Sequence, residues 1–244
     1  MDDLKLAQNA ARQAGDILKK YQKDFLSVNQ DLLHDVKIQA DVESEKILIE
    51  YLSGYTSYSI LSEERGLIPR DQSRRQWIID PVDGSLNYSR GLPINCVSIG
   101  LWEGEEPLLG AVYDFNRDEM FYGSSKEAFL NDQKIKVSDI RQKTQAILAT
   151  GFPANLNFSD DVLRDFLKEI QVYKKLRWLG SAALSICYVA AGRVDAYQEN
   201  NTMWWDIAGA VPIVLGAGAQ MNLKKLGQPF AFDLKVANSF LLNA

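Results

Sequence analysis

The sequence predicts a mixed α/β fold, with an α+β N-terminal part and an α/β C-terminal part. Two helical patterns open the chain, and a strand meander follows over residues 94–137, with turns marked by "EGEEP", "DFNRDE" and "LNDQK". From residue 146 onward, short apolar strands alternate with helical segments, which is typical of an α/β layer. The pattern changes near residue 139 without a flexible linker. We therefore expect two subdomains, 1–138 and 139–244, packed as one compact unit.

The N-terminal part begins with an amphipathic helix. Its apolar positions recur at helical spacing: Leu4, Ala7, Ala11, Ala14, Leu18 and Tyr21. A loop over residues 25–39 and a second helix over 41–53 follow. The segment "YSILSEERG" predicts a short strand that ends at Glu63 and Glu64. Residues 67–76 are polar and indicate a surface loop, and "WIID" predicts a buried strand.

The C-terminal part alternates strands and helices. The expected order after "AILATGF" is a helix over 159–173, a strand near 176–180, a helix over 181–192, a strand over 194–198, a single helix over 204–219 and a closing strand pair. No apolar run reaches membrane-spanning length, and the N-terminus begins acidic, unlike a signal peptide. We therefore expect a cytoplasmic protein without a membrane partner.

Charge and residue usage exclude several kinds of site. The formal net charge is −5 and no basic block is present, which argues against a nucleic-acid surface. Cys96 and Cys187 lie far apart in apolar surroundings, so they are expected to be small core residues of a reducing compartment. His34 is the only histidine, which disfavours a zinc site and a Ser–His–Asp triad. Acid–base or metal chemistry therefore falls mainly on carboxylates, lysines or tyrosines.

Acidic residues stand at four element ends, where a pocket can form. They are Asp41 at a helix start, Glu63 beside Glu64 after a strand, Asp80 with Asp83 after a strand, and Asp206 at a helix start. Converging carboxylates repel one another unless a hard divalent cation lies between them. The alternative for Asp80 and Asp83 is a plain turn, and Asp41 and Asp206 could each be a helix N-cap only.

The "DPVDGS" stretch has the residue types of a metal and anion site. Asp80 and Asp83 can point to one side of the turn, Pro81 stiffens it, and the Val82 carbonyl remains a neutral oxygen ligand. Gly84 permits close approach of the backbone to an anion. A helix that starts at Gly84 or Ser85 would complete a phosphate seat with its N-terminus.

The segment "WIIDPVDGSLNY" resembles the signature of the inositol monophosphatase family of magnesium-dependent, lithium-sensitive-type phosphatases. "SEERG", "GSAALSICYVAAGRVDAY" and "WWDIAGA" agree with the family in order and spacing. The resemblance implies a layered αβαβα sandwich that hydrolyses a small phosphate monoester, of the inositol or sugar phosphate type, with metal-activated water. Alternatives are the 3′(2′),5′-bisphosphate nucleotidase and histidinol-phosphatase branches. A catalytically weak binding or regulatory member is the alternative of another class.

The resemblance also implies roles for individual residues. Glu63, Asp80 and the Val82 carbonyl resemble the ligands of one metal ion, and Asp80, Asp83 and Asp206 those of a second. A third, weaker ion would lie near Glu63. The implied catalytic residues are Asp41, Glu63 and Ser85, with Ser85 in the place of a family threonine. The implied substrate and phosphate contacts are Asp83, Gly84, Ser85, Ser181, Ala182, Glu199 and Asp206.

Cofactor and partners follow from the same resemblance. Two or three Mg²⁺ ions are expected, with Mn²⁺ as a substitute and Li⁺ or Ca²⁺ as inhibitors. The partners are a small phosphorylated substrate and a second copy of the chain, for which the apolar strand "CVSIGLW" at 96–102 offers an interface. Specificity is expected from residues 71–75, 155–158 and 199–203. Lys37 replaces a family threonine that orients the Asp41 position, a departure from the family pattern.

Overall fold

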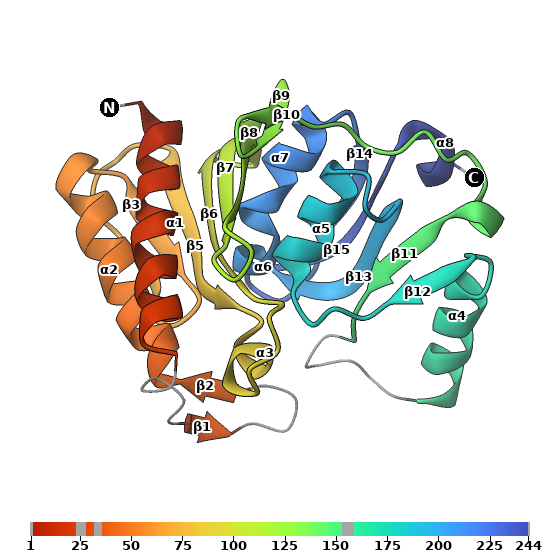
Figure 1. Cartoon of the computed structure of the whole chain (residues 1–244), viewed down its shortest axis with the longest axis horizontal. Helices are drawn as coiled ribbons and strands as arrows, with labels where there is room; N and C mark the ends of the chain where they lie inside the picture. Colours follow the sequence, from red (N-terminus) through yellow and green to blue (C-terminus); the bar gives the residue numbers. More distant parts are fainter. Residues whose placement is uncertain (1, 23–27, 32–35, 153–158, 244) are drawn as a thin grey trace.

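Helices and sheets stack in five alternating layers, as Figure 1 shows. The computed structural model describes residues 2–22, 28–31, 36–152 and 159–243. Helices α1 (Asp3–Lys20) and α2 (Gln39–Tyr55) form the first layer. The second layer is a sheet with the strand order β10 (Gln133–Lys134), β9 (Glu127–Leu130), β8 (Glu119–Ser124), β7 (Glu106–Asp114), β6 (Cys96–Glu103), β5 (Arg75–Asp83), β3 (Ser59–Ser62) and β4 (Gly66–Ile68).

Three helices separate this sheet from a second, smaller one. They are α5 (Ala182–Ala190), α6 (Trp204–Ala208) and α7 (Ala210–Gly216). The smaller sheet has the strand order β12 (Lys175–Arg177), β11 (Ile147–Thr150), β13 (Ala196–Met203), β15 (Ala231–Ala237) and β14 (Gln220–Lys225). Helices α4 (Asp160–Ile170) and α8 (Ser239–Leu242) lie on its outer face (Figure 1). The expected αβαβα order is therefore confirmed.

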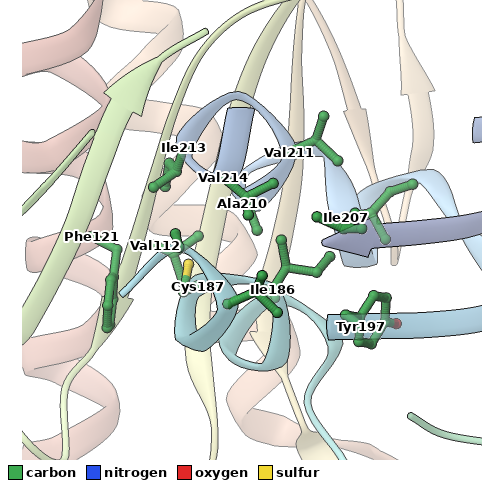
Figure 2. Packing of buried hydrophobic residues seen from close by; sticks show 14 of the residues in the cluster. Val112, Phe121, Ile186, Cys187, Tyr197, Ile207, Ala210, Val211, Ile213 and Val214 are labelled. Carbon is green, nitrogen blue, oxygen red and sulfur yellow. The ribbon is translucent and has the colours of Figure 1, made fainter. Parts of the chain in front are cut away.

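Each interface between layers has its own apolar contacts. Asp2 caps α1 by accepting a hydrogen bond of 2.7 Å from the Lys5 N–H. Of the predicted apolar stripe, Ala7, Ala11, Ala14 and Leu18 are buried, whereas Leu4 and Tyr21 are only partly buried. The small alanines let α1 pack closely on the large sheet. Between the sheets, Val112 and Phe121 meet Ile186 and other residues of α5 and α7 (Figure 2).

Cys187 belongs to that middle core and Cys96 is also buried, so both cysteines are free core residues as expected. The large sheet ends before residue 139 and the small sheet begins after it, and the middle core joins them. The division into 1–138 and 139–244 stays a prediction. Among the described helices, none has both the length and the apolar character needed to cross a membrane.

Several expectations about local structure are wrong in whole or in part. The segment expected to be a loop over 25–39 contains strands β1 (Val28–Asp31) and β2 (Val36–Ile38), which pair antiparallel. These strands are four and three residues long, too short for a pattern of alternation to predict a strand. The expected loop over 67–76 is confirmed over 69–74, but its ends belong to β4 and β5. The "CVSIGLW" segment is β6, which pairs with strands on both sides and is buried, so it is not an interface strand.

The helix expected over 204–219 is two helices, α6 and α7, joined at Gly209. Pro212 has no N–H, so it cannot donate to the Ala208 carbonyl four residues earlier. The Trp102 indole donates to that carbonyl instead, over 3.0 Å. The junction touches the large sheet at Gly100 and Gly110, where a Cβ atom would lie 2.3 Å and 1.8 Å from backbone oxygens of the junction. Any larger residue there would push α6, and with it Asp206, away from the sheet.

Candidate active site

One cavity of about 670 Å³ lies where the two sheets and the middle helices meet, within the size range of small-ligand pockets. Five carboxyl groups line it, from Glu63, Asp80, Asp83, Glu199 and Asp206. Among the described residues that line it, none is lysine or arginine. The cavity wall therefore concentrates negative charge without a protein cation to balance it.

A bulge in β5 places Asp80 and Asp83 on the same side of the strand. Asp80 pairs with Ser98 and Asp83 with Cys96, so two residues of β5 stand opposite a single residue of β6. Residues three apart in a regular strand point to opposite faces, and one extra residue restores the same face. Pro81 lies in the bulge, where a missing ladder hydrogen bond does no harm. The expected turn is thus an irregular strand end, and both carboxyls line the cavity.

Asp80 is the most confined of these acids, with 2% of its surface exposed. Its Oδ1 accepts a hydrogen bond of 3.0 Å from the Val82 N–H. Burial, and next the charge of Glu63, raise the pKa of Asp80 well above its usual range. A cation placed between the Asp80 and Glu63 carboxyls would offset the repulsion of their charges.

Asp83 joins the two halves of the chain. Its Oδ2 accepts hydrogen bonds from the Ser181 hydroxyl and, over 2.9 Å, from the Ala183 N–H, while its Oδ1 accepts from the Ala182 N–H over 3.2 Å. Asp83 therefore caps the N-terminus of α5, a position that stabilises an anion. Burial raises the pKa of Asp83, and the hydrogen bond from Ser181 opposes the increase.

Met203 is the N-cap of α6, and Asp206 is the third residue of the helix rather than the cap itself. Its Oδ2 accepts from the Met203 N–H over 2.9 Å, as in a capped helix, and the residue also lines the cavity. Desolvation, and next the charge of Asp83, raise the pKa of Asp206 to about 8. Glu199 lines the same cavity, and its Oε2 accepts a hydrogen bond of 2.8 Å from the Tyr197 hydroxyl. Desolvation raises the pKa of Glu199 to about 7.

The predicted pair of Asp41 and Ser85 is in contact. The Ser85 hydroxyl lies 2.8 Å from Asp41 Oδ1 and 2.8 Å from the Val82 carbonyl oxygen. Helix α3 (Ser85–Ser89) starts where expected, after Gly84 at φ +88°. A Cβ atom on Gly84 would lie 2.8 Å from the Ile94 carbonyl oxygen, so glycine is required by conformation and by space. Ser85 thus connects a buried carboxylate to the cavity.

The donor set suits a hard divalent cation. The carboxyl oxygens and the Val82 carbonyl are the oxygen donors that Mg²⁺ prefers. Burial, and next the charges of neighbouring carboxyls, raise the pKa of Asp80 and Asp206, and a cation would offset both effects. Within the described chain, no three Asp, Glu, His or Cys side chains are already close enough to hold one ion.

Residues 2–238 match the model of the inositol monophosphatase family. The chain belongs to the inositol monophosphatase family. Among its relatives, "Nus factor SuhB" of Pasteurella multocida is 35% identical over 223 residues, 88% of this chain and 82% of that protein. An "Inositol-1-monophosphatase" of Caulobacter vibrioides is 32% identical over 223 residues, which cover 89% of this chain and 85% of that protein.

Solved structures of the inositol monophosphatase family agree in fold. The extragenic suppressor protein suhB from Bartonella henselae superposes with a TM-score of 0.87 at 30% identity, covering 97% of this chain and 94% of that one. The inositol monophosphatase from Anabaena superposes with a TM-score of 0.84 at 32% identity, covering 98% of this chain and 91% of that one. The predicted family and fold class are confirmed.

The structure brings the predicted site residues of this family member together. Ten of them line the cavity: Glu63, Asp80, Val82, Asp83, Gly84, Ser85, Ser181, Ala182, Glu199 and Asp206. Asp41 is not among the lining residues, but it accepts a hydrogen bond from Ser85, which does line the cavity. His34 and residues 155–158 lie outside the described residues, as does the Lys37 side chain. The roles assigned to all these residues stay predictions.

Glu45 is a site residue that sequence reasoning missed. It is 2% exposed and accepts hydrogen bonds from the Ser62 hydroxyl over 2.5 Å and the Arg65 N–H over 3.0 Å. It therefore holds both ends of the turn that carries Glu63. On the same face of α2, Ser44 donates to the Pro81 carbonyl over 2.8 Å. The available signal was the spacing of Asp41 and Glu45, four residues apart and so on one face of a helix.

Proposed function

We propose that this protein hydrolyses a small phosphate monoester, of the inositol or sugar phosphate type, in a magnesium-dependent reaction with water as the nucleophile. The observation that carries the proposal is the cavity lined by five carboxyl groups, with no lysine or arginine among its described lining residues. A phosphate dianion is repelled by such a wall and binds only if cations neutralise it. Membership of a phosphatase-containing family supports the same reaction class.

Residues of this chain would hold the ions and the phosphate. Glu63, Asp80 and the Val82 carbonyl would hold one Mg²⁺, and Asp80, Asp83 and Asp206 a second. A third, weaker ion would lie near Glu63. When bound, the ions supply charge for the phosphate and the leaving oxygen, and lower the pKa of bound water. Ser181, Ala182 and the backbone of Gly84 and Ser85 would contact phosphate oxygens, and Glu199 a hydroxyl of the substrate.

The contact between Ser85 and Asp41 supports a proton path. Ser85 Oγ faces the cavity and lies 2.8 Å from Asp41 Oδ1. Water next to Ser85 would pass a proton to Ser85 Oγ while the Ser85 hydroxyl proton moves to Asp41 Oδ1. Because Asp41 is 2% exposed, bulk water does not compete for this position. The reaction would then be a direct in-line attack without a covalent intermediate.

Two alternatives remain for the test. Within the phosphatases, the substrate could be a bisphosphate nucleotide or histidinol phosphate. The relatives named "Nus factor SuhB" favour a second class, a catalytically weak regulatory or binding member. Against that class, every predicted ligand acid is present and lines the cavity. We further propose a cytoplasmic location and a homodimer, and inhibition by Li⁺ or Ca²⁺ with Mn²⁺ as a substitute for Mg²⁺.

Phosphate release from a panel of monoesters, with and without Mg²⁺, tests the proposal. The panel holds inositol 1-phosphate, fructose 1,6-bisphosphate, histidinol phosphate and 3′-phosphoadenosine 5′-phosphate. Asp83→Asn keeps the shape of the side chain and should lower kcat/KM more than ~100-fold. Asp165→Asn, whose side chain is 74% exposed on α4, is the matched control and should change little. Mg²⁺ should also raise the Tm of the wild type, because it binds only the native state.

The outcomes separate the classes. Turnover that needs Mg²⁺ and is lost in Asp83→Asn alone supports the enzyme, and the ranking of esters names the branch. A rise in Tm with Mg²⁺ but no turnover on any ester would favour the binding or regulatory class. Neither turnover nor a rise in Tm would contradict the metal site itself.

A further inference from the structure

Aromatic side chains stand at the mouth of the acidic cavity. The rings of Phe152 and Trp178 are 4.5 Å apart between centroids at an interplanar angle of 88°, and Phe166 of α4 lies 4.9 Å from Phe152. Phe152 and Trp178 both line the cavity that contains the acids. We call Phe152, Phe166 and Trp178 the aromatic shelf.

The Trp178 ring packs against neighbouring rings, but much of its surface remains accessible to a ligand. It is 52% exposed, although the edge-to-face contact with Phe152 fixes its ring. Leu86, also 52% exposed, lines the same cavity. Exposed large apolar side chains that converge on a cavity mark a contact surface for a ligand or a partner. A shelf inside the lining of the cavity favours the ligand.

The aromatic shelf adjoins the polar end of the cavity through Gly151. A Cβ atom on Gly151 would lie 2.6 Å from Glu199 Oε2, so the backbone of this residue rests on the Glu199 carboxyl. Phe152 is the next residue in the chain. One ligand can therefore place a phosphate among the acids and an apolar group on the shelf.

Three polar side chains of the cavity wall already use their hydrogen-bond donors within the protein. The Asn87 amide already donates to the Ile94 and Leu179 carbonyls, both over 2.8 Å. The Thr150 hydroxyl donates to the Gln198 carbonyl over 2.6 Å. The Ser185 hydroxyl likewise donates to the Ser181 carbonyl over 2.6 Å. These three side chains are therefore not free to donate to a hydroxyl of the substrate.

Resting on the proposed phosphatase function, but favouring its alternative substrates that contain a planar ring over the inositol and sugar phosphates, we propose that the preferred monoester carries a planar aromatic ring on its alcohol part, and that Trp178 is the specificity-determining residue that contacts this ring. An aromatic ring packs on indole through dispersion and the opposed quadrupoles of the two rings, which a saturated ring of the same size cannot match. The phosphate and the ring are then recognised by different residues of one cavity.

The test compares benzyl phosphate with cyclohexylmethyl phosphate. Both are esters of primary alcohols of similar size, so they differ mainly in the planarity of the ring. The readout is the ratio of kcat/KM for the two esters in wild type, Trp178→Leu and Trp178→Phe. Taking the ratio cancels general damage to the protein. Tyr55→Leu is the matched control, since Tyr55 is 58% exposed at the end of α2 and outside the cavity lining.

We expect the wild type to favour benzyl phosphate by about tenfold, equivalent to about 1.4 kcal/mol. Trp178→Leu should bring the ratio of kcat/KM close to one. Trp178→Phe should keep most of the preference for benzyl phosphate, and Tyr55→Leu should leave the ratio at the wild-type value. An equal ratio in wild type and Trp178→Leu overturns the proposal. So does a changed oligomeric mass in Trp178→Leu with an unchanged ratio, which would assign Trp178 to a subunit contact.

Failure of the proposed phosphatase function has a separate signature. In that case neither ester is hydrolysed in the presence of Mg²⁺. Titration calorimetry with benzylphosphonate and cyclohexylmethylphosphonate then tests the aromatic shelf without turnover. Tighter binding of the benzyl compound that disappears in Trp178→Leu supports the shelf, and equal binding of the two compounds, or no binding of either, overturns it.

Discussion

Replacing Glu45 with alanine should loosen the turn that carries Glu63. The Glu45 carboxylate accepts from Ser62 and from the Arg65 backbone, and it pairs with the Arg65 side chain over 2.9 Å. With alanine at this position, the Ser62 hydroxyl and the Arg65 N–H lose their acceptor. Glu45 itself does not line the cavity, so it acts by positioning Glu63 rather than by touching substrate.

The size of the effect follows from these contacts. A hydrogen bond to a buried charged group contributes about 1.5–3 kcal/mol. The Arg65 side chain is 54% exposed, so its ion pair contributes less, about 0.5–1 kcal/mol. Because the contributions overlap, we expect Glu45→Ala to cost about 3 kcal/mol, or roughly 6–12 °C in Tm for a chain of this length. Glu45→Gln keeps an acceptor for Ser62 and should cost about 1 kcal/mol.

Thermal unfolding and a magnesium titration of activity provide the two measurements. Glu45→Ala should raise the Mg²⁺ concentration for half-maximal rate by about tenfold, as the loss of a residue that orients a metal ligand does. Glu50→Ala is the matched control, because Glu50 is exposed on the same helix. A Tm and a magnesium requirement in Glu45→Ala equal to those of Glu50→Ala would refute the reasoning. A lower Tm with an unchanged magnesium requirement would reduce Glu45 to a structural residue.

Two further predictions test the site. Glu199, with a pKa raised to about 7, favours the protonated form when folded, so its stabilising effect is present below about pH 4.5 and is lost as the pH rises through about 7. In metal-free protein, Glu199→Gln should flatten the decline of stability across that interval, measured by urea unfolding at several pH values; an unchanged decline would contradict the assignment. Gly84→Ala should cost about 2–4 kcal/mol, because φ is +88° and the Cβ would lie 2.8 Å from the Ile94 carbonyl oxygen. Gly54→Ala, with open space around it in α2, should instead be neutral or stabilising in the same unfolding assay, and equal losses in the two variants would contradict the steric argument.

Patterns local in the sequence predicted most of the elements and the acids that line the cavity. The apolar spacing of α1 and the residue types of "DPVDGS" depend on neighbours within a few positions, so they can be recognised without a fold. The start of α3 after Gly84 and the buried cysteines were predicted for the same reason. The family follows from four such motifs in order along the chain, and it implied the αβαβα stacking.

Only the tertiary structure decided how distant residues meet. Asp83 and Ser181 are 98 positions apart, and their hydrogen bond depends on α5 packing between the sheets. The Ala208 carbonyl that Pro212 leaves without a donor is satisfied by Trp102 from another layer, and β6 was misjudged because burial by both neighbours is invisible in one strand. The Glu45 contacts and the aromatic shelf likewise join separate elements. Such contacts are set by how layers stack, whereas propensity and spacing report only on the chain nearby.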